Sequence, residues 1–191
     1  MWLGQSRGDE TRMIEVLEIG PDNRPRVKGD EATHVTYLDR LSWPLPNLVV
    51  WDLDNLPLPF PDDKLDFIHA HHVLEHSSRF PDLMDELHRI LKPTGRLFAT
   101  VPHMDWEMRF GPMPTHYRFF TEKTFNWSGI DYAKRWKVTK MDTVRYYHRI
   151  LERGGGRIIK NPTLRRIVYL MLYSPFLSQK IEIRVTLTPI K

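Results

Sequence analysis

The chain has 191 residues, a formal net charge of +4 and no cysteine, and 41% of its residues are hydrophobic. This length and composition are typical of a folded globular domain with a sizeable core. The missing cysteines exclude disulfides and thiolate metal sites. No apolar run reaches the roughly 18 residues that a membrane-spanning helix needs, and the first residues lack a signal-peptide core. We therefore expect a cytoplasmic protein.

The first third of the chain predicts short strands, each closed by a turn or an acidic residue. Runs rich in valine and isoleucine indicate strands over Met13–Ile19, Thr33–Leu38 and Leu48–Trp51. Residues 20–32 contain two prolines and are too polar for a full crossover helix between the first two strands. The sequence therefore predicts a shortened first crossover.

The stretch Leu65–Pro102 predicts a strand, a helix and a second strand. Leu65–Ala70 and Arg96–Val101 are short apolar runs, and Pro81–Leu91 has its apolar residues at helical spacing. Lys92–Gly95 contains proline and glycine, which end the helix. Such a unit forms a right-handed parallel crossover, and ligands bind at the carboxyl ends of its strands.

The pattern weakens after residue 102. Asp105–Thr115 has the composition of a loop, and short helices are predicted over Glu122–Trp127 and Pro162–Tyr173. Trp136–Tyr147 has strand character, and Glu182–Thr188 alternates clearly between apolar and polar residues. We predict that these two runs form an antiparallel pair at the edge of the sheet.

Four stretches together resemble the class I S-adenosylmethionine-dependent methyltransferases, specifically the type 11 methyltransferase domain. They are Val16–Pro21, Val35–Asp39, Asp52 with Leu56–Asp62, and Leu65–Pro102. Two runs in the last stretch are similar to the turn and the helix end of this family. These runs are Val73-Leu-Glu-His76 and Arg89-Ile-Leu-Lys-Pro-Thr-Gly95.

The resemblance implies one methyltransferase domain over residues 1–191. The cofactor half would span about residues 13–102, and the substrate-side loops and last strands about residues 103–191. The expected fold is α/β, a Rossmann-like and mainly parallel twisted sheet with a C-terminal antiparallel strand pair. Helices are expected on both faces of the sheet.

The cofactor that the resemblance implies is S-adenosyl-L-methionine. Asp39 lies 19 residues beyond Gly20, near the spacing at which an acidic residue meets a ribose diol. Asp52 follows the third strand, where it can accept the adenine amino group, and by analogy with the family Leu53 flanks the ring. The expected cofactor-binding residues are Glu18, Gly20, Pro21, Asp39, Asp52, Leu53, His71 and His72.

The glycine-rich turn departs from the G-x-G-x-G pattern of the family. Asp22 and Arg24 occupy the second and third glycine positions. Aspartate tolerates a positive φ better than most residues, so the turn can survive this change. The chain has no G-x-G-x-x-G run for a pyrophosphate, which disfavours a nicotinamide dinucleotide as cofactor.

The acceptor side is expected to come from the loops above the sheet. We predict His103, His116 and Tyr117 as the catalytic residues that face the acceptor. Methyl transfer needs alignment more than acid–base help, and a base matters only for a hydroxyl or a protonated amine. The expected reaction is methyl transfer to a small-molecule or glycan-like acceptor, with oxygen favoured over nitrogen.

Three alternatives remain open. The altered glycine turn allows a non-catalytic methyltransferase-like binding or partner module. The basic segment 145–166 allows an RNA methyltransferase, although a nucleic-acid partner is not favoured, and 145–177 allows peripheral membrane contact. His72-Val-Leu-Glu-His76 matches the H-x-x-E-H pattern of a zinc hydrolase. The methyltransferase pattern explains the same letters, so no metal is expected among the site residues.

Overall fold

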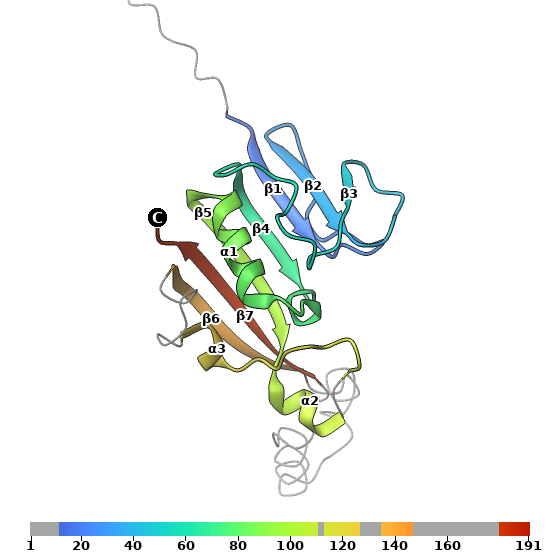
Figure 1. The fold of residues 1–191 in the computed structure, drawn as a ribbon, viewed down its shortest axis with the longest axis vertical. Helices are drawn as coiled ribbons and strands as arrows, with labels where there is room; N and C mark the ends of the chain where they lie inside the picture. The colour runs from blue at the N-terminus through green and yellow to red at the C-terminus, as the bar shows by residue number, and fades with distance from the viewer. Residues whose placement is uncertain (1–11, 111–112, 127–134, 147–179) are drawn as a thin grey trace, which may run out of the picture.

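The computed structural model describes residues 12–110, 113–126, 135–146 and 180–191. Its seven strands form one sheet in the order β3-β2-β1-β4-β5-β7-β6 (Figure 1). The strands are β1 (Ile14–Ile19), β2 (Thr33–Asp39), β3 (Leu48–Val50), β4 (Leu65–His71), β5 (Leu91–Pro102), β6 (Trp136–Tyr146) and β7 (Lys180–Pro189). The predicted helix over residues 162–173 lies outside the described residues.

The sheet is parallel from β3 to β5, and β7 runs antiparallel to both β5 and β6. The predicted mainly parallel sheet with a terminal antiparallel pair is therefore confirmed. The chain moves outward in one direction from β1 to β3 and in the other from β4 to β5. A cleft forms at such a point of reversal, at the carboxyl ends of the central strands.

In the described residues, three α-helices and one 3-10 helix accompany the sheet. They are η1 (Leu74–His76), α1 (Phe80–Ile90), α2 (Met104–Phe110) and α3 (Glu122–Asn126). The predicted apolar face of α1 is confirmed, because Leu83, Leu87 and Ile90 are completely buried against the sheet. Phe80 and Met84 extend this face and are equally buried.

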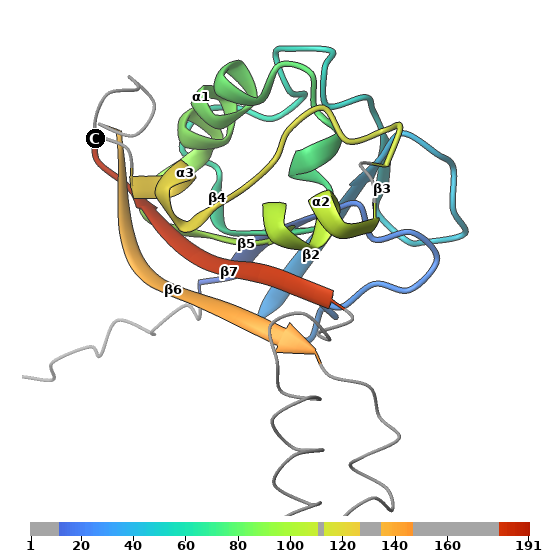
Figure 2. The same ribbon diagram turned by 90° about the horizontal axis from the view of Figure 1, so that it is seen from below.

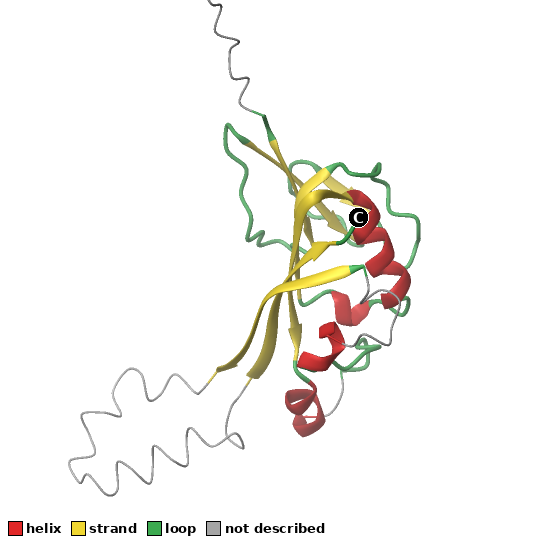
Figure 3. Ribbon diagram, turned by 90° about the vertical axis from the view of Figure 1, so that its left-hand side faces the viewer, coloured by secondary structure: helices red, strands yellow, loops and turns green. Residues whose placement is uncertain are grey.

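The described helices all lie on one face of the sheet, where helices were expected on both (Figures 2 and 3). Right-handed crossovers that lead in opposite directions from the centre of a sheet cross opposite faces. The β4-to-β5 crossover carries α1, whereas residues 20–32 and 40–47 join β1, β2 and β3 without a helix. On the face of the sheet opposite α1, the shortened crossover therefore covers only a small apolar cluster, formed by Val16, Val35 and Tyr37.

Two local predictions were wrong. Residues 104–110 form α2, where a loop was expected, and β5 begins at Leu91 instead of Arg96. Its first residues contain a register shift against β4, because Leu65 pairs with Leu91 and Phe67 with Arg96. Gly95 is closely surrounded in this irregular segment. A Cβ atom there would lie 2.6 Å from a methyl group of Leu91 and 3.0 Å from the carbonyl oxygen of Lys92, so a larger residue would force these neighbours to shift.

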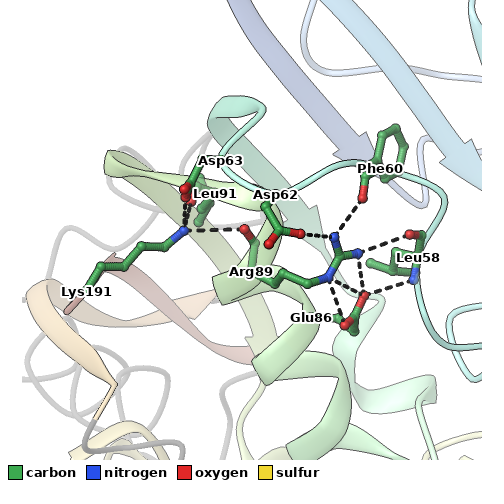
Figure 4. Close-up of polar contacts among 8 residues, drawn as sticks. All are labelled: Leu58, Phe60, Asp62, Asp63, Glu86, Arg89, Leu91 and Lys191. Carbon is green, nitrogen blue, oxygen red and sulfur yellow. Dashed lines mark hydrogen bonds and ion pairs between the residues drawn. The ribbon is translucent and has the colours of Figure 1, made fainter.

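Arg89, at the end of α1, fastens the proline-rich loop that precedes β4 (Figure 4). Its guanidinium donates hydrogen bonds to the carbonyl oxygens of Phe60 at 2.9 Å and Leu58 at 3.2 Å. It also forms ion pairs of 2.7 Å with Glu86 and with Asp62. The arginine of the Arg89–Gly95 run therefore has a structural role.

We expect Arg89→Met to lower the free energy of unfolding by about 2 kcal/mol, because two carbonyl groups and Glu86 lose a charged donor. Hydrogen bonds from Arg89 are the main cause that holds the pKa of Glu86 below its ordinary value of 4.5. Because the pKa of Glu86 is lower in the folded state than in the unfolded state, the ionised carboxylate stabilises the fold at pH values above the unfolded-state pKa. This stabilisation is lost as the pH falls through the folded-state pKa. Urea unfolding at several pH values should therefore show the difference from wild type narrowing below pH 4.5.

Arg79→Met is the control for this experiment, because the Arg79 side chain is half exposed and its ion-pair partner Asp82 is also exposed. Exposed pairs of this kind contribute little, so its effect should stay within about 0.5 kcal/mol. Equal losses for the two arginines would contradict the role given to Arg89.

Candidate functional site

A cleft of about 520 Å³ lies at the carboxyl ends of β1, β2 and β4. This volume is in the range of about 300–1,000 Å³ that small-molecule sites occupy. Seven of the predicted site residues line it. They are Gly20, Asp39, Asp52, Leu53, His71, His72 and Tyr117.

The turn after β1 keeps the backbone close to the cleft. Gly20 has a φ of 68°, and a Cβ atom there would lie 3.0 Å from Cγ2 of Val73. Asp22 takes the left-handed conformation as well, with a φ of 51°. The turn therefore survives although aspartate stands where the family pattern has its second glycine.

Glu18 is completely buried and does not line the cleft. Its carboxylate accepts hydrogen bonds from the backbone N–H groups of Arg26 and Val27, the shortest at 2.9 Å. The hydroxyl of Tyr37 donates to the carbonyl of Val27 at 2.8 Å. Side chains thus hold the shortened crossover in place of a helix. Pro21, also expected at the cofactor, is buried outside the lining.

Asp39 is the last residue of β2, and Asp52 follows the neighbouring strand β3; both line the cleft. One oxygen of each carboxylate accepts a hydrogen bond of 2.9 Å from a backbone N–H group two residues further on. Asp39 accepts from Leu41, and Asp52 accepts from Asp54. The carboxylates are therefore oriented before a ligand arrives. Trp51 also lines the cleft, and its indole N–H donates to the carbonyl oxygen of Asn55 at 2.6 Å, which fixes the ring.

His71 and His72 form the part of the lining that follows β4. His72 has a φ of 50°, and its ring lies between two buried carboxylates. Its Nε2 is 3.1 Å from Glu182 on β7, and its Nδ1 is 3.3 Å from Glu75. His72 therefore connects the wall of the cleft to the antiparallel part of the sheet.

The three predicted catalytic residues do not lie together. Tyr117 lines the cleft and is exposed. His103 is buried outside the lining, where its Nδ1 accepts from the N–H of Asp105 at 3.0 Å and its Nε2 contacts Glu122 at 3.3 Å. His116 also lies outside the lining, but its ring packs edge-on against His76, with 4.8 Å between ring centres.

Sequence reasoning missed six polar or aromatic residues of the lining. They are Asp22, Arg26, Arg40, Trp51, His76 and Thr115. Trp51 and Arg40 are next to Asp52 and Asp39 in the sequence, so their position beside predicted site residues could have indicated that they line the cleft. Arg26 belongs to the polar crossover and carried no motif. His76 ends both the Val73-Leu-Glu-His76 run and the H-x-x-E-H pattern, but neither pattern predicts that it lines the cleft.

A family model described as a methyltransferase domain matches residues 7–131. The chain belongs to the methyltransferase domain family. The prediction of a class I S-adenosylmethionine-dependent methyltransferase domain is thus confirmed. The strand order and the cleft of this methyltransferase domain agree with the assignment. A search of curated proteins found no match to the sequence.

Solved structures similar to this methyltransferase domain share its fold at low sequence identity. An Archaeoglobus fulgidus SAM-dependent methyltransferase is 14% identical, with a TM-score of 0.60 over 92% of this chain and 86% of that one. The Bacillus subtilis YcgJ protein is 16% identical, with a TM-score of 0.58 over 95% and 94%. The Burkholderia thailandensis 1,6-didemethyltoxoflavin-N1-methyltransferase, solved with S-adenosylhomocysteine, is 15% identical, with a TM-score of 0.56 over 94% and 72%.

Among the described residues of the methyltransferase domain, no helix is both long and apolar enough to cross a bilayer. Most of the basic segment 145–166, and of the segment 145–177 considered for membrane contact, lies outside the described residues.

Proposed function

We propose that the chain transfers a methyl group from S-adenosylmethionine to an oxygen of a small-molecule or glycan-like acceptor. The observation that carries this proposal is the open cleft that has the Gly20 turn on one side and two carboxylates on the other. The acceptor oxygen forms a bond to the methyl carbon as the carbon–sulfur bond breaks. S-adenosylhomocysteine leaves, and the acceptor proton passes to solvent or to a base.

The proposed cofactor pose follows the order of the strands. The methionine part lies against the backbone of Gly20, where no side chain intervenes, and Arg26 is available for its carboxylate. Asp39 accepts from the ribose hydroxyls, as a carboxylate after the second strand does in nucleotide-binding sheets. Asp52 accepts from the adenine amino group, and the ring lies against Trp51 and Leu53.

On the acceptor side, Tyr117 is the proposed contact to the substrate, because its exposed ring lines the cleft beside His76. His116 lies behind His76, so we propose that it acts through that residue. The ring of His103 contacts Glu122 and the N–H of Asp105, so we propose that His103 has a structural role at the start of α2 and does not contact the acceptor. The acceptor therefore approaches between η1 and the segment around residues 115–117.

Calorimetric titration with S-adenosylhomocysteine tests the cofactor part of this proposal. We expect one equivalent to bind with a dissociation constant in the micromolar range. Transfer of a labelled methyl group from S-adenosylmethionine to separate pools of sugars, phenols, amines and RNA tests the acceptor part. Label in the hydroxyl pools supports the proposal, and label only in RNA supports the nucleic-acid alternative.

The non-catalytic module is the second candidate function, because Asp22 and Arg24 replace two glycines of the family pattern. It predicts an occluded cleft beside Gly20 and Asp39, whereas these residues line an open one. Absence of S-adenosylhomocysteine binding at millimolar concentration would favour this module over the enzyme.

A further inference from the structure

A cluster of titratable side chains lies beside the cleft and outside the proposed cofactor contacts. One ligand atom from each of Glu75, His76 and His116 lies within 4.8 Å of the other two. Two hydrogen bonds of 2.9 Å join the segments that carry them. The N–H of Tyr117 donates to the carbonyl of Glu75, and Nδ1 of His76 contacts the carbonyl of Thr115. The backbone therefore holds His116 against η1.

The hydrogen bonds of the two histidines determine which ring nitrogen remains available. A carbonyl oxygen can only accept, so the contact with Thr115 requires a proton on Nδ1 of His76. Nδ1 of His116 contacts Oε1 of Glu107, a carboxylate, which also accepts. In the neutral imidazoles, both Nε2 atoms then carry the lone pair. A carbonyl or carboxylate behind each ring is the arrangement that orients metal-binding histidines.

The carboxylates of this cluster are buried without enough partners. The exposed fraction is 1% for Glu75 and 0% for Glu107. In the described part of the chain, Oε2 of each carboxylate has no hydrogen-bond partner. Burying an ionised carboxylate costs several kcal/mol unless hydrogen bonds or a cation offset it. A cation held at Glu75 would remove this cost.

We propose that Glu75, His76 and His116 bind a divalent transition-metal ion, and that Glu107 positions His116. Two imidazole nitrogens and one carboxylate oxygen form a common ligand set for Zn²⁺ with an open fourth position, and they also suit Fe²⁺. The site differs from the H-x-x-E-H reading of the sequence. His116, from a distant segment, takes the place of His72, whose two ring nitrogens face Glu75 and Glu182.

The open position of the ion faces the acceptor side, because His76 lines the cleft together with Thr115 and Tyr117. The part that the ion plays rests on the proposed function. A bound divalent ion lowers the pKa of a coordinated hydroxyl, so the acceptor oxygen loses its proton to solvent before it attacks the methyl group. An amine needs its nitrogen lone pair to attack the methyl group, and coordination to the ion would occupy that lone pair. The site thus favours a hydroxyl acceptor over an amine.

Metal binding is tested on the full chain without any cofactor. The protein is stripped with a chelator and divided into two samples. One sample is titrated with Zn²⁺ in a calorimeter, desalted and analysed for metal. The other, still free of metal, is titrated with Co²⁺ to record its visible absorption. We expect one equivalent of zinc and the absorption bands of a four- or five-coordinate cobalt site. His76→Ala and His116→Ala should each weaken binding at least about 100-fold, and Glu107→Gln should weaken it about 10-fold.

His34→Ala is the matched control, because His34 is an exposed histidine that pairs with Glu15 far from the cleft. It should retain one equivalent of zinc. The proposal is overturned if the wild type retains no metal, or if His116→Ala retains as much as His34→Ala. In either case the histidines form only an ion-paired cluster with the carboxylates.

Titration of the metal-free protein with S-adenosylhomocysteine tests the proposed function separately from the metal site. It also shows whether each variant is folded. Normal S-adenosylhomocysteine binding without zinc uptake refutes the metal site alone. Zinc uptake without S-adenosylhomocysteine binding refutes the proposed function alone. A His116→Ala variant that binds S-adenosylhomocysteine normally is folded. Its loss of zinc binding then shows that His116 is a metal ligand.

Discussion

Asp39→Ala should weaken S-adenosylhomocysteine binding about 100-fold. In the proposed pose, this carboxylate accepts two hydroxyl hydrogen bonds from the ribose. Each bond to a charged group is worth about 1.5 kcal/mol, and about 1.4 kcal/mol corresponds to a tenfold change in affinity. Calorimetric titration of both proteins measures the ratio directly.

Asp39→Asn separates ribose binding from the local turn, because an amide oxygen can still accept from the N–H of Leu41. We expect it to bind about tenfold more weakly than wild type, since one neutral acceptor replaces the charged carboxylate. Asp82→Ala, on the exposed side of α1, is the control and should bind normally. An unchanged affinity in Asp39→Ala would show that the ribose does not lie after β2.

Glu18→Ala should lower the free energy of unfolding by about 3–5 kcal/mol, because it leaves two partly buried N–H groups without their charged acceptor. Those groups belong to Arg26 and Val27 in the shortened crossover. Denaturant unfolding followed by circular dichroism gives the difference. Cofactor affinity should fall as well, since Asp22 and Arg26 of this loop line the cleft.

Glu18→Gln keeps one acceptor oxygen and the side-chain volume, so it should lose about half as much stability and remain folded. Glu31→Ala, at an exposed position of the same crossover, serves as the control with an expected change within about 0.5 kcal/mol. A similar small change in Glu18→Ala would mean that other contacts hold the crossover.

The strands could be predicted from the sequence because each is a short run of β-branched and apolar residues between strong turn signals. The face of α1 was equally readable from the spacing of Leu83, Leu87 and Ile90. The short helix α2 was not, because its run of Met, Asp, Trp and Glu residues is too short for a periodic pattern. The true start of β5 was hidden by Pro93 and Gly95, which usually end regular structure.

The site was predictable where it depends on local spacing. Gly20, Asp39 and Asp52 each lie at or just after the carboxyl end of a strand, and parallel strands bring these ends together. The cluster of Glu75, His76 and His116 was not predictable, because residues far apart in the chain meet there only after folding. The burial of Glu18 was hidden for the same reason, since its partners are backbone groups of a loop without a motif.

The position of β7 has a consequence for synthesis on the ribosome. β7 lies between β5 and β6 in the sheet, although it follows both of them in the chain. The parallel strands β1 to β5 can pair as they emerge, but the outer edge of β5 stays open until residues 180–189 have left the ribosome. An open apolar edge attracts other chains. The nascent protein is therefore exposed to aggregation at this edge until β7 pairs with β5.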